Sequence, residues 1–333
     1  MTVNDCVDSG HILGYGQGWF PGKISPVDVI IPLKDRRTVV SCVTQLLALK
    51  GAIDTIWLCD GGSSDAELLA DLERLKGQPK VRVLPSPMIS GKVPQKGLCQ
   101  PWEAIAGFNK ATLINRGIAQ ANAEFLLVSD ADILWPATAI EALLTAVQAE
   151  PDSIAYVQTV QESNPQSDSL RRSRYRYRLY RETDRVTIAI ETVPPQSDPQ
   201  RPGCGLICAR RHTLLQLGGY KDCFRGWGWE DQDLLMRAEL LGFSIITAGA
   251  VTHLSHSDAC RNQFYPGMEP TQSRDRNILT CLTQLQARQV LGSLASSMPG
   301  TARPTLPTSK DGQAITIHIS LPEAFVRPAD PIT

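Results

Sequence analysis

The stretch Glu124-Phe125-Leu126-Leu127-Val128-Ser129-Asp130-Ala131-Asp132 joins an apolar segment to a pair of carboxylates. A short apolar run bounded by polar residues is typical of a buried strand, and the acids follow at its expected end. In an extended chain the side chains at i and i+2 project to the same side, so we expect Asp130 and Asp132 to lie together. Neighbouring carboxylates repel each other unless a cation lies between them, and oxygen ligands suit Mg²⁺ or Mn²⁺. The alternative is a strand-end turn with solvated acids.

Short apolar runs alternate with segments of helical spacing on both sides of this stretch. The alternation predicts an α/β fold in which helices flank both faces of a mostly parallel sheet. Ligands of such sheets bind beyond the carboxyl ends of the strands, where Asp60 is expected as well as Asp130. The expected strands are 27–32, 55–59, 81–84, 124–128, 154–159, 206–209 and 243–247, and the expected helices are 38–49, 66–75, 110–121, 136–148 and 231–241.

Composition and charge limit the class of protein. The 333 residues suit one large α/β domain with additions, and the net charge of -1 gives no basic field for a nucleic-acid partner. The nine cysteines are scattered without metal-ligand spacing, which indicates free thiols in a reducing compartment. No window reaches the roughly 18 apolar residues of a membrane span. We therefore expect a soluble, cytoplasmic protein whose membrane contact, if any, is peripheral.

A second motif is Gly226-Trp227-Gly228-Trp229-Glu230-Asp231-Gln232-Asp233, which leads into a helix-compatible segment. Glycine lets the backbone approach a ligand closely, tryptophan provides a flat wall, and a carboxylate can accept a proton. The motif predicts a binding pocket with its own base. Further along, His253 and His256 follow an expected strand. Imidazole beside carboxylates would favour Mn²⁺ over Mg²⁺; the alternative is a pair of structural histidines.

Two segments are less regular. Residues 160–202 interrupt the alternation with a basic and aromatic run, 171–181, and a proline-rich loop, 194–199. The run could bind phosphates or stack on sugars or bases; the alternative is a solvated, membrane-facing or salt-bridged helix. After about residue 292 the chain is rich in Ser, Pro and Thr, and we expect a weakly ordered or peripheral tail.

Several segments, in order, resemble the GT-A type family-2 glycosyltransferases, and within them the β1,4-galactosyltransferase and chondroitin-synthase branch. The resemblance covers roughly residues 25 to 280 and implies a Rossmann-like GT-A fold with one catalytic domain, an inserted basic segment and a C-terminal tail. Trp229 stands where the family usually has a small residue. The matching segments are Ile30–Arg36, Asp60–Ser63, Phe108–Gly117, Ser129–Asp132, Gly203–Gly219, Gly226–Asp233 and the stretch that begins at His256.

The resemblance implies a metal-dependent, inverting transfer of a hexosyl or N-acetylhexosaminyl group from a UDP-sugar. The acceptor would be a hydroxyl of a glycan, a lipid-linked sugar or a peptide. Asp231 would be the base and Glu230 would orient the acceptor, while Trp227, Gly228 and Trp229 would line the acceptor side.

The same resemblance implies Mn²⁺, or Mg²⁺, as the cofactor. Asp132 and His256 would be its ligands, with Asp130 and His253 as further candidates. The chain would divide into an N-terminal extension (1–24), a nucleotide-sugar-binding half (25–160), an acceptor-binding half with the metal histidine (161–290) and a tail (291–333). The implied donor-side residues are Pro32, Lys34, Arg36, Asp60, Phe108, Lys110, Asp130, Ala131 and Asp132.

Two other classes of function stay open from the sequence. A non-catalytic protein could use such a cleft to bind a glycan or a nucleotide-sugar, although the chain carries both the acidic pair and the proposed base. A sugar nucleotidyltransferase would need a Gly-rich loop with a basic residue after its first strand, and none is found at that position.

Overall fold

The computed structural model describes residues 25–49, 51–86, 108–167, 174–194, 200–257, 260–296, 303–308, 311–312, 314–322 and 325. The expected N-terminal extension lies outside these residues, as do parts of the expected basic run, proline-rich loop and tail. Within the described ranges no helix combines the length and apolar character needed to cross a lipid bilayer, and the cysteines are free.

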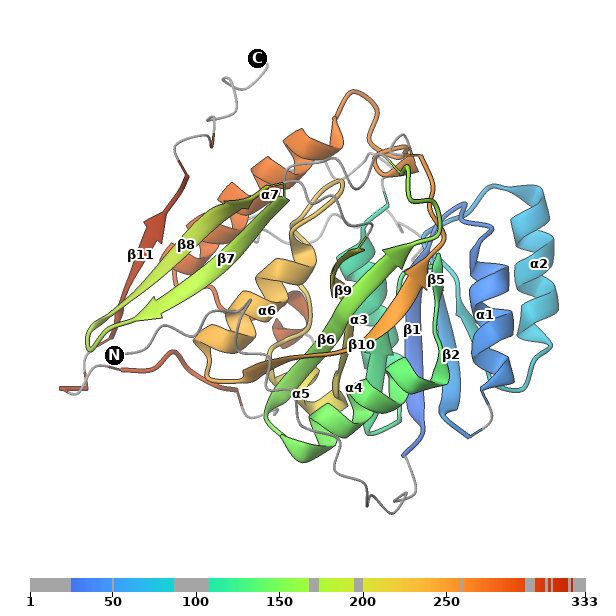
Figure 1. Ribbon diagram of the computed structural model, residues 1–333, viewed down its shortest axis with the longest axis horizontal. Helices are drawn as coiled ribbons and strands as arrows, with labels where there is room; N and C mark the ends of the chain where they lie inside the picture. The colour runs from blue at the N-terminus through green and yellow to red at the C-terminus, as the bar shows by residue number, and fades with distance from the viewer. Residues whose placement is uncertain are drawn as a thin grey trace.

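A large mixed sheet forms the centre of the molecule (Figure 1). Its strands are β1 (Val27–Leu33), β2 (Ile53–Asp60), β3 (Val81–Leu84), β4 (Phe125–Val128), β5 (Ile133–Leu134), β6 (Ser153–Glu162), β9 (Gln200–Arg210) and β10 (Ser244–His253). Their order is β3-β2-β1-β4-β9-β6-β10-β5. Strands β3, β2, β1 and β4 pair in parallel. Strand β9 runs antiparallel to both β4 and β6, and β10 runs parallel to β6. The sheet is therefore mostly parallel, as the sequence predicts.

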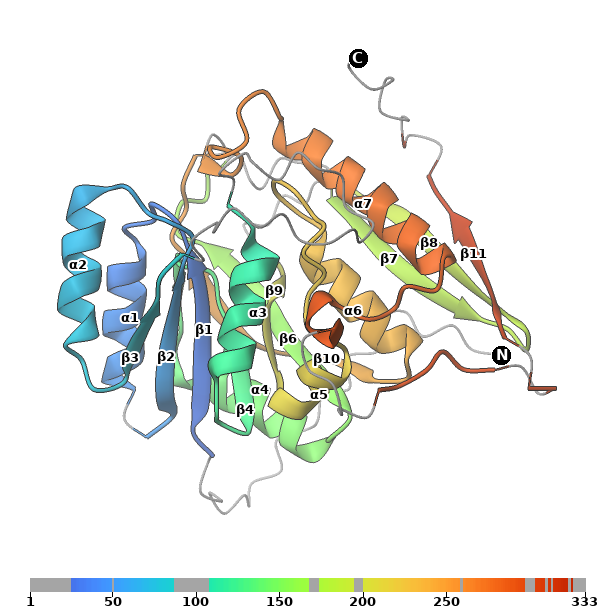
Figure 2. The ribbon, with the colours of Figure 1, turned by 180° about the vertical axis from the view of Figure 1, so that it is seen from behind.

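Helices cover both faces of this sheet (Figure 2), which explains why every residue of β1 is buried. Alternate β1 side chains enter two separate apolar clusters: Val29 and Ile31 face α1, α2 and α4, whereas Ile30 faces α3, α5 and α6. The helices are α1 (Val39–Ala48), α2 (Ala66–Lys76), α3 (Lys110–Gln120), α4 (Ala137–Ala149), α5 (Arg211–Gln216), α6 (Glu230–Leu240) and α7 (Pro270–Gln286).

Side-chain caps fix the start of two helices that border the site. Asp65 accepts a hydrogen bond from the Leu68 backbone N–H at the start of α2. Asn109 caps α3 through the Thr112 N–H and donates its own amide to the Asp222 carbonyl. This second cap makes Lys110 the first residue of α3 and ties it to the chain before α6.

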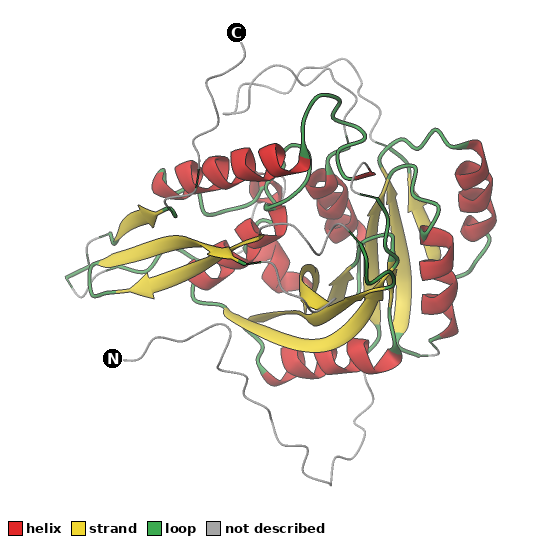
Figure 3. Ribbon diagram, turned by 45° about the horizontal axis from the view of Figure 1, so that its top comes forward, coloured by secondary structure: helices red, strands yellow, loops and turns green. Residues whose placement is uncertain are grey.

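A smaller sheet contains β7 (Arg174–Arg181), β8 (Arg185–Val193) and β11 (Thr316–Ser320). Figure 3 shows the β7–β8 hairpin beside α7, and its apolar side chains join those of α6 and α7 in a third core cluster. The helix alternative for the basic run is wrong for residues 174–181, because tyrosine and leucine on alternate positions of a strand pack against this cluster. Within the expected tail, β11 forms an edge strand that pairs with β8, so this part of the tail is peripheral but regular.

Candidate functional site

A cavity of about 1080 Å³ lies beyond the carboxyl ends of β1 and β4 and extends under the small sheet. That volume is large enough for a ligand of several rings. Of the site residues predicted from sequence, Asp60 alone does not line it. The predicted residues that do are Pro32, Lys34, Arg36, Phe108, Lys110, Asp130, Ala131, Asp132, Trp227, Gly228, Trp229, Glu230, Asp231, His253 and His256.

Asp132, His253 and His256 form a compact group with metal-ligating chemistry, their ligand atoms all within 4.8 Å of one another. The Nε2 atom of His253 lies 3.5 Å from Oδ1 of Asp132, and Nε2 of His256 lies 3.4 Å from Oδ2. The end of β10 is brought there by its pairing with β5 and by a hydrogen bond from the Leu254 N–H to the Asp132 carbonyl. Both histidines that the sequence left as alternatives thus face the same carboxylate.

Glu162 contacts this group from the side away from the cavity, and no sequence motif pointed to it. The residue ends β6 in register with His253 on β10, and its side chain is fully buried. Its Oε2 accepts hydrogen bonds from Nδ1 of His253 at 2.6 Å and from the Ser255 hydroxyl at 2.8 Å, and Oε1 accepts one from Arg201 at 3.1 Å. A carboxylate on Nδ1 leaves Nε2 free to ligate and fixes the ring orientation.

Charge interactions keep Asp132 ionised. Burial opposes ionisation, but hydrogen bonds from His253 and His256, together with the positive charge of Arg36, lower the pKa of Asp132. Burial also opposes protonation of His253, yet hydrogen bonds to Asp132 and Glu162 raise its pKa to about 9. Binding of a cation at this group would therefore release a proton, because a ligating imidazole is neutral.

We expect Glu162→Gln to weaken Mn²⁺ binding by about 10–100-fold, because such outer carboxylates hold metal-ligating histidines in place. The measurement is a Mn²⁺ titration followed by electron paramagnetic resonance. Glu124→Gln, a matched change of an exposed glutamate, should leave the titration unchanged. An unaltered Mn²⁺ affinity in Glu162→Gln would show that the glutamate does not position His253 for a metal.

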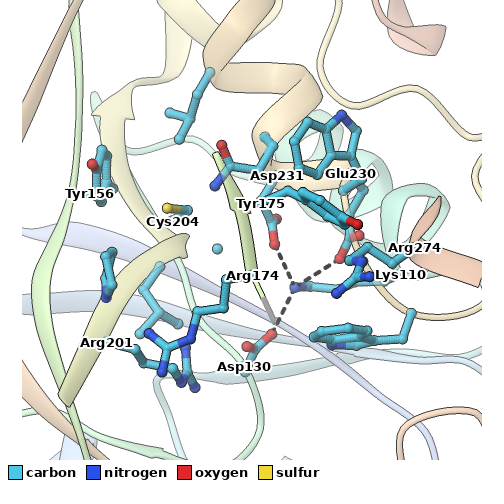
Figure 4. Close-up of a pocket in the computed structure, with 18 of the residues that line it drawn as sticks. Lys110, Asp130, Tyr156, Arg174, Tyr175, Arg201, Cys204, Glu230, Asp231 and Arg274 are labelled. Atoms are coloured by element: carbon cyan, nitrogen blue, oxygen red, sulfur yellow. Dashed lines mark hydrogen bonds and ion pairs between the residues drawn. The ribbon is translucent and has the colours of Figure 1, made fainter. Parts of the chain in front are cut away.

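Lys110 connects the acidic pair to the second motif (Figure 4). Its Nζ lies 3.0 Å from Oδ1 of Asp130, 3.3 Å from Oε1 of Glu230 and 3.4 Å from Oδ2 of Asp231. Burial would lower its pKa, but the three carboxylates raise it well above the usual value. Asp130 therefore faces Lys110, while Asp132 faces the histidines, and Asp130 is outside the metal-ligating group found among the described residues.

Asp231 lies in the first turn of α6. Burial raises the pKa of its carboxyl to about 7, the charges of Glu230 and Asp130 add to the rise, and Lys110 opposes it. One oxygen, Oδ1, is buried without a hydrogen-bond partner in the described part of the chain. A carboxylate with a pKa near neutrality and an unused acceptor atom is suited to taking a proton from a hydroxyl.

Gly205 on β9 makes room for this carboxylate. A methyl group at Gly205 would lie 2.5 Å from Oδ2 of Asp231 and 3.0 Å from its Cγ. The neighbouring strand therefore has no side chain at the position that the Asp231 carboxylate occupies. In the sequence, Gly203–Gly219 is identified only as a segment that resembles the family, and the requirement for glycine at 205 is visible only from this contact.

We expect Gly205→Ala to lower the turnover of the reaction proposed below by at least about tenfold, since displacement of a reacting group by 1 Å can cost ~100-fold. Turnover and thermal unfolding would be measured together. Gly77→Ala is the control, because Gly77 ends α2 with a negative φ of -69°. Normal turnover in Gly205→Ala would mean that the Asp231 carboxylate need not occupy its observed position.

The two tryptophans of the second motif have different surroundings. Trp229 is 5% exposed and packs with Phe224 and Met236 in the third core cluster. It adopts a left-handed backbone conformation with φ of 79° at the start of α6, so it fixes where that helix begins. Trp227 is half-buried, and the guanidinium of Arg261 lies 4.7 Å from its ring centre. Trp227 offers the more accessible aromatic surface.

Asp60 organises a turn next to the cavity. Its carboxylate accepts hydrogen bonds from the Ser63 N–H at 3.0 Å and from the Ser63 hydroxyl at 2.6 Å. The following Gly61 donates its N–H to the Leu33 carbonyl at the end of β1. Its implied role on the donor side stays a prediction.

Comparison with known proteins gives the family. Residues 99–269 match the model of the family described as "Glycosyltransferase like family 2", which is half of the chain. A search of curated proteins found no match. The chain is similar to the crystal structure of GalNAc-T7 with UDP, GalNAc and Mn²⁺, with 14% identity and a TM-score of 0.51, over 79% of this chain and 48% of that one. It thus spans about half the length of that structure.

Two structures of Drosophila β1,4-galactosyltransferase 7 are also similar. The complex with xylobiose has 14% identity and a TM-score of 0.32, with 67% of this chain and 65% of that chain covered. A mutant in complex with manganese, UDP-Gal and xylobiose has 13% identity and a TM-score of 0.38, with coverages of 75% and 80%. By its match to the family model, the chain belongs to glycosyltransferase-like family 2, and its sheet and helices form the GT-A fold.

Proposed function

We propose that this chain is a metal-dependent, inverting glycosyltransferase that moves a sugar from a UDP-sugar to a hydroxyl of a carbohydrate, lipid-linked or peptide acceptor. The observation that carries the proposal is one cavity with two complementary parts. Asp132, His253 and His256 offer metal ligands, and Asp231 offers a base whose pKa is near neutrality. The UDP and Mn²⁺ in the GalNAc-T7 structure support this choice of donor and metal.

The residues present fit a divalent cation. One carboxylate with two imidazoles favours Mn²⁺ over Mg²⁺, which prefers oxygen ligands. Asp132, His253 and His256 would hold the ion, which when bound neutralises negative charge on a departing diphosphate.

The proton step is assigned to Asp231. Its carboxylate takes the proton of the acceptor hydroxyl as that oxygen attacks the anomeric carbon on the face opposite the leaving UDP. A single displacement of this kind inverts the anomeric configuration. The positive charge of Lys110 offsets the repulsion among Asp130, Glu230 and Asp231. It therefore keeps the base close to the first carboxylate of the acidic pair. Glu230, 8% exposed, orients the acceptor.

The donor half is assigned to residues 25–160 and the acceptor half to residues 161–290. Pro32, Lys34, Arg36 and Phe108 line the donor end of the cavity. Phe108 and Phe264 have ring centres 5.9 Å apart, and Nζ of Lys34 lies 4.6 Å from the Phe264 ring centre. Aromatic rings beside a cation suit a nucleobase with an attached diphosphate.

Incubation with a panel of UDP-sugars, Mn²⁺ and mixed glycan acceptors tests the proposal. Release of UDP with formation of a glycosylated product, and its loss on chelation of the metal, is the expected result. Release of pyrophosphate from UTP and a sugar phosphate would instead indicate a nucleotidyltransferase. Binding of UDP-sugar without turnover across the panel would indicate a non-catalytic protein.

A further inference from the structure

Two arginines from different strands meet on one side of the cavity. Arg174 begins β7, and Arg201 is the second residue of β9. Both line the cavity, and Figure 4 shows them side by side, across from Lys110 and Asp231. Like charges so close together repel each other, and an arrangement of this kind is stabilised when an anion binds between them.

The carboxylates nearby do not satisfy both guanidinium groups. Arg201 donates to Glu162, but Glu162 is shared with His253. Nη2 of Arg174 is buried and has no hydrogen-bond partner among the described residues. A buried donor without a partner is costly, so this nitrogen is available to a ligand. Burial and the charge of Arg201 lower the pKa of Arg174, and the negative charges of Glu162 and Cys204 offset them only in part.

Arg174 differs from the arginines that follow it on the same strand. Arg176 and Arg178 each donate from Nε to Oε2 of Glu191, at 2.9 Å in both cases. Both guanidinium groups therefore share the one carboxylate of Glu191 within the β7–β8 hairpin. Arg174 differs from both because its Nη2 has no hydrogen-bond partner among the described residues, at the point where the strand reaches the cavity.

The Arg174 and Arg201 pair lies close to the proposed base. Arg201 and Gly205, the residue that touches Asp231, are four positions apart on β9 and thus separated by at most about 13 Å. Cys204 is near enough to feel the charges of both Asp231 and Arg201. A ligand the size of one or two sugar rings can therefore place a hydroxyl at Asp231 and a second group at the arginines.

We propose that Arg174 and Arg201 bind an anionic group, a carboxylate or a phosphate, carried by the acceptor. The proposal rests on the proposed transfer function and narrows its acceptor to an acidic glycan or a phosphate-linked sugar. Guanidinium groups bind such planar or multi-oxygen anions through paired N–H donors. The anion fixes the acceptor at one end, while Asp231 acts at the other.

Equilibrium binding of matched probes tests this proposal without requiring turnover. The probes are phenyl β-D-glucuronide and phenyl phosphate, with neutral phenyl β-D-glucoside as the reference, each titrated by calorimetry with and without UDP and Mn²⁺. We expect at least one anionic probe to bind about tenfold or more tightly than the glucoside. The glucuronide would identify a sugar carboxylate as the group recognised, and phenyl phosphate would identify a phosphate.

Variants place the effect at the arginines. In Arg174→Gln the preference for the anionic probe should disappear. Arg174→Lys should retain part of this preference, because lysine keeps the positive charge but lacks the paired N–H donors of the guanidinium group. Arg185→Gln removes the same charge at an exposed position away from the cavity and should bind like the wild type. Thermal unfolding of each variant shows that the fold is intact.

Three results would overturn the proposal: equal binding of anionic and neutral probes, an anion preference that survives in Arg174→Gln, or a loss of UDP affinity in Arg174→Gln. The last would assign the pair to the donor diphosphate. Failure of the wild type to bind UDP with Mn²⁺ would instead overturn the proposed function. The two failures can be distinguished because the probes are also titrated in the absence of UDP.

Discussion

We expect Asp231→Asn to lower kcat for sugar transfer by about 10²–10⁴-fold, the usual contribution of a general base. Asparagine has the same shape but cannot take the acceptor proton at neutral pH. Lys110 keeps its contacts with Asp130 and Glu230 in the variant, so these two carboxylates should keep their positions. Affinity for UDP with Mn²⁺ should therefore stay within about twofold of the wild type, because the metal-ligating group is untouched.

The measurement is initial-rate kinetics with a saturating UDP-sugar over a range of pH. In the wild type, transfer should fall as the pH drops through about 7, since a carboxyl whose pKa is raised to that value is progressively protonated below it. Asp222→Asn is the matched control, because Asp222 is exposed. Wild-type turnover in Asp231→Asn would contradict the assignment of this residue as the base.

We expect Asp132→Ala to remove metal-dependent binding of UDP. Asp132 supplies the only carboxylate of the three-residue metal-ligating group in the described chain, and it is the group that both histidines face. Loss of the Asp132 carboxylate should lower metal affinity by more than the roughly 10–100-fold that follows from removing a residue that only positions a ligand. The fold should survive, because the preceding Ala131 is held through its carbonyl by the hydroxyl of Thr38.

Calorimetric titration with UDP, with and without Mn²⁺, measures this effect. In the wild type the metal should increase UDP affinity strongly, and in Asp132→Ala the two titrations should coincide. Asp54→Ala removes an exposed carboxylate from β2 and should behave like the wild type. Retention of the metal effect in Asp132→Ala would exclude this group as the cation site.

Local sequence patterns were sufficient for the central sheet. The apolar runs that predict β1, β2, β3 and β4 are the segments that enter the two large core clusters, so their composition reflects burial directly. The acids beyond them lie at the expected edge of the sheet. The predicted juxtaposition of Asp130 and Asp132 is different in detail, because β4 ends at Val128 and the chain turns at Ala131. The two carboxylates then face separate partners.

The remaining features depend on contacts between distant segments. Glu162 meets His253 across 91 positions through the register of β6 with β10, and no local pattern specifies that register. Gly205 is required by the position of Asp231, which only the packing of α6 on β9 determines. The strand β7 could have been predicted, because arginine alternates with tyrosine and leucine from Arg174 onward, and a period of two indicates a strand.

A crystal structure of the protein with UDP and Mn²⁺ is the most direct test that this cavity is the transfer site. We expect an anomalous manganese peak in contact with the Asp132 carboxylate and with Nε2 of His253 and of His256. We also expect the diphosphate at that ion, with the Asp231 carboxylate facing the space beside it. Manganese and UDP bound elsewhere would show that this cavity is not the transfer site, and UDP in this cavity with the ion away from all three residues would show that they are not the metal ligands.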